Sequence, residues 1–411
     1  MNLHLQKSTI QKESAIQITG SKSESNRLLL LQALFPEIDI KNLSNSDDSV
    51  LMTKALASKS DVIDIHHAGT AMRFLTAFFS TQQGREIELT GSQRMKERPI
   101  AILVDALNQL GAEILYKENK GFPPLIIKGK NLSKNIVTLK ANVSSQYISA
   151  LLLIASKLEN GLELTLEGEI TSVPYIKMTL SLLEEIGVKT NFKDNLITVN
   201  PNKQQPTTNN KQLIVESDWS SASYFYSIVA MSEVGTRIKL SSYKKNSLQG
   251  DSVLAEIYKA FGVSTTFEDN AVLLQKTKNT TPETHINFDL KNAPDIAQTI
   301  AVTAFGLGLS GYLTGLHTLK IKETDRLVAL KTEIEKLGGT VKITEDSLTL
   351  DASNNIKQNI AIATYNDHRM AMAFAPLALK VSIIIQDYKV VSKSYPTFWD
   401  DLDALGFKFS I

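Results

Sequence analysis

A stretch of helical pattern that ends in a glycine and leads into a strand-like stretch recurs along this chain. Glycine directly after a helix favours the left-handed conformation that terminates helices. A weaker, earlier copy begins near residue 48. The pattern predicts about six related repeats of roughly 75 residues, each of mixed helix and strand. The five clearer copies end at Gly111, Gly187, Gly262, Gly338 and Gly406, with spacings of 76, 75, 76 and 68 residues.

Several repeats continue with two strand-like stretches around an Asp- or Asn-rich turn, as in FKDNLITV, FEDNAVLL and ITEDSLTL. One repeat alone leaves helix faces uncovered, so the repeats must pack on one another. A polar tract at 201–211 lies near the midpoint of the chain. It is either an ordinary surface loop or, as we favour, a loop close to the boundary between two pseudo-symmetric domains. A cleft between such domains is the expected ligand site.

The composition excludes several classes of protein. The 411 residues, 43% of them apolar, suffice for two domains with sizeable cores. Because 44 basic residues nearly balance 43 acidic ones, we expect neither nucleic acid nor a membrane as partner. Without cysteine there is no disulfide, thiolate metal site or cysteine nucleophile. We recognise no signal-peptide pattern, and the apolar runs are too short to cross a bilayer, so we expect a cytoplasmic protein.

Arginine is scarce in this chain, with 8 among the 44 basic residues. Its planar guanidinium binds carboxylate or phosphate through two hydrogen bonds, which lysine cannot do. The clustering predicts a site for a small anion with several oxygens, whereas surface salt bridges are the alternative. The arginines that fall in short polar clusters are Arg27, Arg73, Arg94, Arg98, Arg326 and Arg369.

The first cluster, GSKSESNR at 20–27, precedes a run of leucines. It has a single glycine, so it does not fit the glycine-rich loop of nucleotide-binding proteins. If a helix starts near Ser23, then Ser23 and Arg27 lie one turn apart on one face. The partial positive charge of the helix start, with Lys22 just before it, adds to the attraction for an anion.

Other clusters in the first half also lie at expected helix starts. Gly69 permits close approach of a ligand, and Thr70 is the expected N-cap there. Arg98 belongs to a basic run before Pro99 that is otherwise read as solvated charge. Five further residues carry hydroxyl or amide groups that suit a phosphate or a sugar, and helix capping does not require all of them. They are Ser144, Ser145, Gln146, Ser172 and Tyr175.

The second half combines carboxylates with cations. Lys322 and Arg326 are four residues apart and are expected on one helix face, with Glu323 beside them. Neighbouring cations lower the pKa of a carboxyl and burial raises it, so a general acid requires burial to dominate. Salt bridges on a helix surface and charges that complement a helix dipole are the alternatives. Further candidates are Asp295, Asp367, His368, Arg369 and Lys393.

In their order along the chain, these motifs resemble the EPSP synthase (3-phosphoshikimate 1-carboxyvinyltransferase) family. They are GSKSESNR, AGTAMR, RMKERPI, SSQY, the SVPY segment, PD, KETDR, YNDHRMAM and KSYP, and they cover residues 20–396. The resemblance implies an α/β fold of two domains, each of three βαβαββ repeats in an inverse α/β barrel, with the active site in the interdomain cleft. The implied domains are 20–216, and 1–19 together with 217–411.

The resemblance also implies a reaction and its residues. The enolpyruvyl group of phosphoenolpyruvate would pass to the 5-hydroxyl of shikimate 3-phosphate, and phosphate would leave. No metal or cofactor is implied, and we expect a monomer. Asp295, Glu323 and Lys22 would be catalytic. Shikimate 3-phosphate would contact Lys22, Ser23, Arg27, Ser144, Ser145, Gln146, Ser172, Tyr175, Asp295 and Lys322. Phosphoenolpyruvate would contact Lys22, Gly69, Arg98, Gln146, Arg326, Arg369 and Lys393.

Three residues depart from the family pattern and bear on substrate affinity: His67 and Thr318 stand where asparagine is usual, and Phe74 where proline is common. Because Gly69 leaves room beside phosphoenolpyruvate, we expect glyphosate to inhibit. The rival interpretations are a transferase acting on a UDP-amino sugar, a nucleic-acid-binding repeat protein and a non-catalytic anion-binding scaffold. The lack of cysteine disfavours the transferase acting on a UDP-amino sugar, and the neutral charge disfavours the nucleic-acid-binding protein. The presence of Asp295 and Glu323 disfavours the non-catalytic scaffold.

Overall fold

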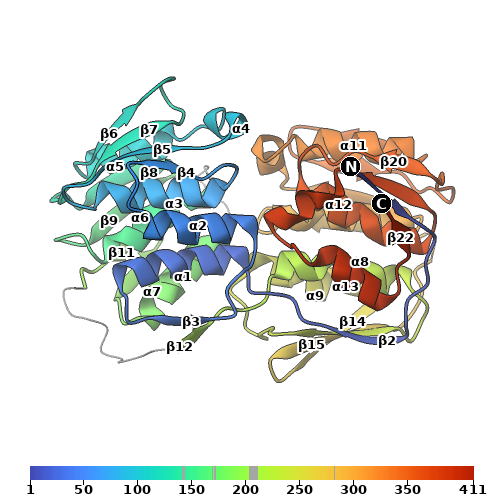
Figure 1. Cartoon of the computed structure of the whole chain (residues 1–411). Coiled ribbons are helices and arrows are strands. Elements are labelled where there is room, and N and C mark those ends of the chain that lie inside the picture. The colour runs from blue at the N-terminus through green and yellow to red at the C-terminus, as the bar shows by residue number, and fades with distance from the viewer. Residues whose placement is uncertain (141–143, 169, 171–172, 203–211, 282) are drawn as a thin grey trace. The chain divides into compact units, whose positions relative to one another are not determined.

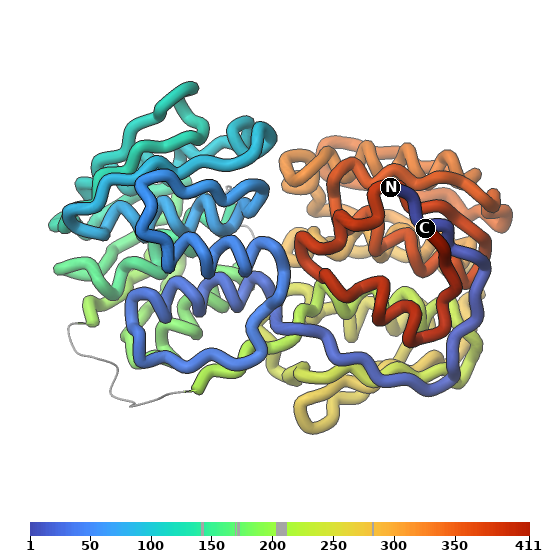
Figure 2. Tube along the Cα trace, viewed as in Figure 1, coloured from blue at the N-terminus to red at the C-terminus, as the bar shows by residue number. Residues whose placement is uncertain are grey.

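The structure, a computed structural model, describes residues 1–140, 144–168, 170, 173–202, 212–281 and 283–411. The chain forms two compact units (Figure 1). The first unit is Gly20–Val215, and the second unit consists of Met1–Thr19 with Glu216–Ile411. Figure 2 follows the chain as it leaves the second unit near residue 20 and returns to it near residue 216.

The four-stranded sheets of the described residues share one topology. The sheet β4-β5-β7-β6 illustrates it: β4 and β5 are parallel, β7 is antiparallel to β5, and β6 is antiparallel to β7. A helix follows each of the first two strands, so the repeat is βαβαββ and the fold class is α/β, as predicted. The last two strands form the hairpins expected from the Asp- and Asn-rich turns.

The first unit contains two such sheets, β4-β5-β7-β6 and β10-β11-β9-β8, and the parallel pair β12-β3. The pair β12-β3, with α1 and α2, is a shortened repeat, which explains the weak similarity near residue 48. The strands are β3 (Asp39–Lys41), β4 (Val62–Asp64), β5 (Glu86–Thr90), β6 (Glu113–Tyr116), β7 (Leu125–Lys128), β8 (Ile136–Lys140), β9 (Leu162–Glu167), β10 (Thr190–Lys193), β11 (Leu196–Val199) and β12 (Gln212–Ile214). The helices are α1 (Lys22–Leu34), α2 (Asp47–Ala57), α3 (Gly69–Ser80), α4 (Gln93–Lys96), α5 (Ala101–Gln109), α6 (Ser145–Ala155) and α7 (Val173–Glu185).

The second unit contains the sheets β14-β15-β13-β2, β16-β17-β19-β18 and β20-β21-β1-β22. Its strands are β1 (Asn2–Leu5), β2 (Glu13–Ile16), β13 (Arg237–Ser241), β14 (Val263–Glu268), β15 (Ala271–Lys276), β16 (His285–Asp289), β17 (Ser310–Thr314), β18 (Val341–Ile343), β19 (Leu348–Leu350), β20 (Ile360–Ile362), β21 (Ile383–Gln386) and β22 (Phe409–Ser410). Its helices are α8 (Trp219–Met231), α9 (Leu254–Ile257), α10 (Ala297–Gly306), α11 (Arg326–Lys336), α12 (His368–Phe374) and α13 (Phe398–Leu405). Its 3-10 turns are η1 (Gly250–Val253), η2 (Tyr258–Phe261), η3 (Pro294–Ile296), η4 (His317–Ile321), η5 (Ala375–Leu379) and η6 (Tyr388–Lys393).

The two ends of the chain complete one sheet of the second unit. β1 lies between β21 and β22 and pairs antiparallel with both, so Asn2 faces Gln386 and His4 faces Ser410. In Figure 2 the blue N-terminal segment accordingly lies beside the red C-terminal one. The last repeat thus takes its fourth strand from the start of the sequence, a pairing that the repeat pattern did not reveal.

The predicted helix-ending glycines have the expected conformation. Each of the five has a positive φ, from 74° at Gly262 to 106° at Gly406. A residue with a Cβ atom is strained in this conformation, whereas glycine is not. The repeat read from the sequence therefore corresponds to a recurring helix end in the structure.

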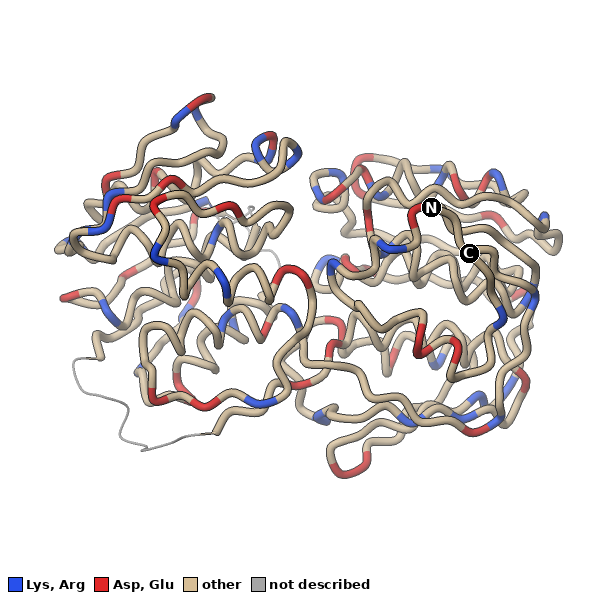
Figure 3. The backbone as a smooth tube through the Cα atoms, viewed as in Figure 1, with Lys and Arg blue, Asp and Glu red and all other residues tan. Residues whose placement is uncertain are grey.

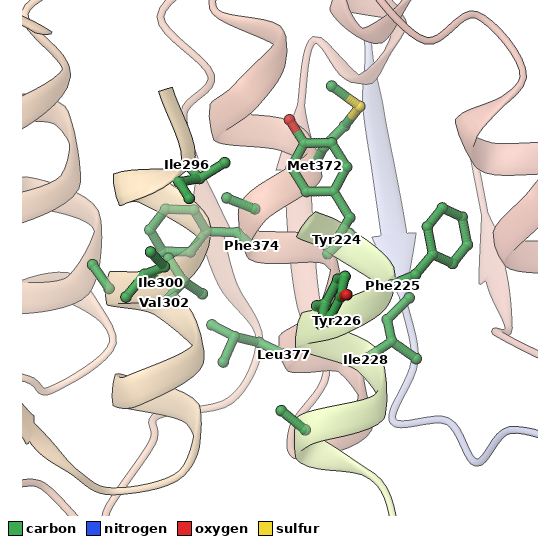
Figure 4. Packing of buried hydrophobic residues seen from close by; sticks show 14 of the residues in the cluster. Tyr224, Phe225, Tyr226, Ile228, Ile296, Ile300, Val302, Met372, Phe374 and Leu377 are labelled. Carbon is green, nitrogen blue, oxygen red and sulfur yellow. The ribbon is translucent and has the colours of Figure 1, made fainter. Parts of the chain in front are cut away.

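The helix after the first strand of a repeat is buried on every side and lies in the core. In α3, α10 and α12 every residue is buried, and in α8 all but Ser220 are. Figure 4 shows how α8, α10, α12 and η5 pack, with Tyr224, Ile300 and Phe374 among the residues between them. Because these inner helices pack tightly, their first turns hold polar groups in fixed positions.

The surface carries both signs of charge. In Figure 3, basic and acidic segments are interspersed along the described part of each unit, as the composition implies. In the described residues, no helix combines the length and the apolar character needed to cross a membrane.

Candidate active site

In the first unit, Arg27 on α1 joins three helices, α1, α6 and α7. Its side chain is 2% exposed, and its Nη1 donates to the carbonyl of Ser23 at 2.7 Å, which confirms that the two residues lie one turn apart. Nε donates to Oγ1 of Thr179 on α7 at 2.8 Å, and Nη2 donates to Oγ of Ser149 on α6 at 2.9 Å. These acceptors are neutral, so burial lowers the pKa of Arg27 to about 10.

Aromatic rings also contact this guanidinium. Its carbon lies 5.5 Å from the ring centre of Phe74 and 5.9 Å from that of Tyr175. A cation over an aromatic face is stabilised by the charge distribution of the ring. Phe74, a departure from the family pattern, therefore has a local role in packing Arg27.

The start of α3 is built differently from our expectation. Ala68 occupies the N-cap position and makes no side-chain cap, so the prediction that Thr70 is the N-cap is wrong. Thr70 lies within the first turn, and its Oγ1 accepts a hydrogen bond from Nε2 of Gln146 at 3.2 Å. The hydrogen bond joins the starts of α3 and α6, whose motifs, AGTAMR and SSQY, are separate in the sequence.

Arg98 lies against the start of α3 because residue 69 is glycine. A Cβ atom at position 69 would lie 2.5 Å from Nη1 of Arg98. Among the described residues, neither Arg98 nor Lys22 at the start of α1 has a hydrogen-bond acceptor or carboxylate partner. Guanidinium and ammonium groups beside positive helix starts repel these helix ends, and a bound anion offsets the repulsion.

Arg73 stabilises the start of α3 and the residue that follows Arg98 through hydrogen bonds to their backbone. Its Nη1 donates to the carbonyl of Gly69 at 3.0 Å, and its Nη2 donates to that of Pro99 at 3.3 Å. Burial and the charge of Arg98 lower the pKa of Arg73 to about 10. The family resemblance assigns no substrate contact to Arg73, although this arginine belongs to the AGTAMR motif.

The remaining candidates of the first unit lie at the starts of α6 and α7. Ser144 is the N-cap of α6 and accepts from the backbone N–H of Gln146 at 3.4 Å, while Ser145 is buried in its first turn. Tyr175, in the first turn of α7, is half-buried. Ser172 lies outside the described residues.

In the second unit, one buried arginine binds three carboxylates. Arg326 is 2% exposed, and its Nε lies 2.6 Å from Oδ2 of Asp367. Its Nη1 lies 2.8 Å from Oδ1 of Asp295, and its Nη2 lies 2.8 Å from Oε2 of Glu323. Burial alone would lower the pKa of Arg326, but Asp367, Glu323 and Asp295 outweigh it and raise that pKa.

Asp295 is the carboxylate with the most cations around it. Besides Arg326, Nζ of Lys322 lies 3.4 Å from Oδ1, and Nη2 of Arg369 lies 3.5 Å from Oδ2. Burial would raise the pKa of Asp295, but Lys322, Arg369 and Arg326 together bring it well below its usual value. Asp295 is therefore ionised at neutral pH in the protein without ligand.

Lys322 and Arg326 reach Asp295 by a route other than the predicted one. Helix α11 begins only at Arg326, with Asp325 as its N-cap, and Lys322 lies in the turn after η4. The expectation of one helix face is therefore wrong. The two cations meet because both the turn and the first residue of α11 lie beside η3, which carries Asp295.

Arg369 and Lys393 lie around the start of α12. Asp367 is the N-cap, and its Oδ1 accepts from the backbone N–H of Arg369 at 2.9 Å. Nη1 of Arg369 donates to the carbonyl of Asp295 at 3.1 Å. Nζ of Lys393 donates to the carbonyl of Asn366 at 2.6 Å. Among the described residues, no three His, Cys, Asp or Glu side chains are placed to hold a metal ion.

Comparison with known proteins gives this arrangement a family. The model of the family described as EPSP synthase (3-phosphoshikimate 1-carboxyvinyltransferase) matches residues 55–402. The chain belongs to the EPSP synthase family. The 3-phosphoshikimate 1-carboxyvinyltransferase of Bacteroides fragilis is 47% identical over an alignment of 408 residues that covers 98% of this chain and 97% of that protein. The enzyme of the same name from Haemophilus influenzae is 36% identical, with 96% and 97% covered.

Solved structures agree with the family in fold. An EPSP synthase of Acinetobacter baumannii superposes with a TM-score of 0.80 at 20% identity, covering 100% of this chain and 99% of that chain. The enolpyruvyl transferase NikO of Streptomyces tendae gives a TM-score of 0.72 at 11% identity, covering 100% and 98%.

Sequence reasoning missed residues that hold the EPSP synthase motifs in place. Asp367 was noted but not included in the site, although it is fully buried and binds Arg326. Ser220 and Asp251, which lie beside Arg369, were missed entirely. The local signal was the DWSS segment, which is typical of a helix start. Ser220 and Asp251 are each more than a hundred residues from Arg369 in the sequence, so their association with it could not be read from a local pattern.

Proposed function

We propose roles for individual residues in the transfer of the enolpyruvyl group of phosphoenolpyruvate to the 5-hydroxyl of shikimate 3-phosphate, the reaction that this enzyme catalyses. The observation that supports them most directly is the Arg326 cluster. One buried guanidinium binds both Asp295 and Glu323, and two further cations contact Asp295. A base, an acid and fixed positive charge are what addition to an anionic enol phosphate and elimination of its phosphate require.

In the addition step, the 5-hydroxyl oxygen forms a bond to C2 of phosphoenolpyruvate. Asp295 takes the hydroxyl proton, and Glu323, with Lys22 assisting, delivers a proton to the methylene carbon C3. The adduct keeps its carboxylate and phosphate charges, which the arginines stabilise throughout. In the elimination step, Glu323 takes back a proton from C3 as the bond between C2 and the phosphate oxygen breaks. The products are the enolpyruvyl ether and phosphate.

The ligand itself would make Asp295 a better base. Without ligand, Lys322, Arg369 and Arg326 lower the pKa of Asp295 and favour its ionised form. An anion that pairs with Arg326 and Arg369 cancels part of their charge, so the pKa of Asp295 rises toward its ordinary value. The hydroxyl proton is then accepted more readily once both substrates are bound.

The binding roles remain those that the family motifs imply. Shikimate 3-phosphate would contact Lys22, Ser23, Arg27, Ser144, Ser145, Gln146, Ser172, Tyr175, Asp295 and Lys322. Phosphoenolpyruvate would contact Lys22, Gly69, Arg98, Gln146, Arg326, Arg369 and Lys393. The absence of acceptors for Lys22 and Arg98 among the described residues supports an anion there.

Two of the departures from the family pattern have structural correlates. Oγ1 of Thr318 is buried without a hydrogen-bond partner among the described residues, so it retains a donor and an acceptor for a substrate hydroxyl. Nδ1 of His67 lies 2.7 Å from Nδ1 of His66. We propose that Thr318 takes the place of the usual asparagine in contacting shikimate 3-phosphate.

The function is tested by phosphate release from phosphoenolpyruvate in the presence of shikimate 3-phosphate, compared with UDP-N-acetylglucosamine. We expect release with the first acceptor only. Release with UDP-N-acetylglucosamine alone would contradict the assignment. We also propose that the protein is a cytoplasmic monomer, which sedimentation of the purified chain and fractionation of cells would check.

A further inference from the structure

Asp251 is a buried carboxylate to which the roles above assign nothing. It lies in η1, is 2% exposed, and its Oδ2 accepts a hydrogen bond from the hydroxyl of Ser220. Its Oδ1 has no hydrogen-bond partner among the described residues. The ionised form of a carboxyl is unfavourable when the group is removed from water and the protein offers it so few hydrogen bonds.

Ser220 links Asp251 to the site. A serine hydroxyl has one proton, and here that proton is donated to Asp251. The oxygen lone pairs of Ser220 are thereby directed elsewhere, and Nη2 of Arg369 donates to this oxygen at 3.3 Å. Asp251 thus sets the direction of the hydroxyl that orients Arg369.

The charged and hydrogen-bonding groups that act on Asp251 come from three other elements. Asp218 and Ser220 belong to α8 and its N-cap, Asp295 to η3 and Arg369 to α12. On α9, Glu256 pairs with Lys259 at the surface. Burial first, and then the charges of Asp295 and Asp218, raise the pKa of Asp251 to about 7, although Arg369 and the hydrogen bond from Ser220 oppose this.

We propose that Asp251 is a positioning residue for Arg369 and that it takes up a proton from solvent when phosphoenolpyruvate binds to that guanidinium. The inference rests on the proposed binding of phosphoenolpyruvate at Arg369, whose Nε has no acceptor among the described residues. The bound anion cancels the positive charge that keeps Asp251 ionised and adds negative charge nearby. The carboxylate then binds a proton, and no covalent bond other than the new O–H bond is formed.

Linkage fixes the sign of the pH dependence. A ligand whose binding is accompanied by proton uptake binds more weakly as the pH rises above the pKa of the free protein. If ligand binding raises the pKa of Asp251 by about one unit, the KM for phosphoenolpyruvate rises about fourfold between about pH 7 and about pH 8.5. Phosphate monoesters complete their ionisation near a pKa of about 6, so the ligand contributes little in this range.

The test compares the KM for phosphoenolpyruvate at saturating shikimate 3-phosphate across this pH range in three proteins. Asp251→Asn keeps an acceptor for the Ser220 hydroxyl but cannot titrate, so its KM should change less than about 1.5-fold. Asp401→Asn is the matched control, because Asp401 also has a raised pKa and accepts hydroxyl hydrogen bonds, from Tyr395 at 2.8 Å and Thr397 at 3.2 Å. The control should show the rise of about fourfold expected for the wild type.

A second variant tests the positioning role. Ser220→Ala removes the hydroxyl between Asp251 and Arg369 and should raise the KM several-fold at every pH, while the pH dependence persists. If the wild type turns over but Asp251→Asn shows the same pH dependence, the inference of proton uptake is overturned. An unchanged KM in Ser220→Ala would overturn the positioning role. Absence of turnover in the wild type would overturn the proposed function and, with it, this inference.

Discussion

The buried arginines of the two units have opposite surroundings. In the first unit, Arg27 and Arg73 donate chiefly to hydroxyl and carbonyl oxygens, and burial lowers the pKa of each to about 10. In the second unit, Arg326 and Arg369 contact carboxylates, which raise their pKa above the ordinary value. The first arrangement leaves positive charge for an anion to neutralise, whereas the second holds carboxylates that can exchange protons.

The comparison supports our proposal that proton transfer occurs in the second unit, and replacing Glu323 by Gln tests this most severely. Glutamine retains the shape but cannot donate an acidic proton, so kcat should fall by about 10²–10⁴-fold with the KM values little changed. Steady-state phosphate release measures both. Glu335→Gln is the control, because Glu335 lies on the same helix α11 and pairs with Lys331 at the surface. Unchanged turnover in Glu323→Gln would refute its role as the acid.

Removal of one arginine from each unit measures the difference in surroundings directly. Arg326→Met removes the cation that Asp295, Glu323 and Asp367 share, although Lys322 and Arg369 still contact Asp295. It should lower the free energy of unfolding by about 3–5 kcal/mol. Arg27→Met leaves Ser149 and Thr179, whose hydroxyl oxygens are 2.9 Å apart and can bond to each other. Its cost should be about 1–3 kcal/mol. Urea unfolding of both variants provides the measurement, and equal losses would contradict the contrast.

Gly69→Ala tests the anion-receptive surface of the first unit. The added Cβ would displace the guanidinium of Arg98, which lies 2.5 Å from its position. Overpacking costs about 1–3 kcal/mol, so the KM for phosphoenolpyruvate should rise roughly tenfold with a smaller change in kcat. Gly111→Ala serves as control, since its positive φ of 99° adds backbone strain but nothing lies near the new Cβ. A tenfold KM change in the control would show that general destabilisation, not Arg98, is responsible.

Acid titration should reveal the smallest difference. The lowered pKa of Asp295 gives stability that is present above its unfolded value of about 4 and is lost as the pH falls below it. Asp251, with its raised pKa of about 7, acts oppositely and adds stability as the pH falls from about 7 to about 4. The first-unit arginines stay protonated throughout.

Tryptophan fluorescence can follow the second unit alone, because both tryptophans, Trp219 and Trp399, belong to it. Below about pH 4, we expect the second unit to lose its fluorescence signal before hydrogen exchange accelerates in α3 of the first unit. Loss of α3 protection first would contradict the comparison.

Much of the local structure was predictable, because it depends on neighbouring residues. The glycine-terminated helices, the hairpins and the helix starts at Lys22 and Ser145 follow from short patterns. The errors concern the first residues of two helices. Thr70 bonds to Gln146, 76 residues away in the sequence, instead of capping α3. Helix α11 starts after Lys322 because the side chain of the neighbouring Asp325 caps it.

The sequence by itself determined the repeat, the family and most of the residues that meet in each unit. Only the tertiary structure decided that β1 completes the last sheet beside β21. It also decided that Asp367 binds Arg326 and that Ser220 links Asp251 to Arg369. The physical reason is that helix ends and turns follow from local backbone preferences, whereas strand pairing and buried charge depend on which distant groups share one desolvated environment.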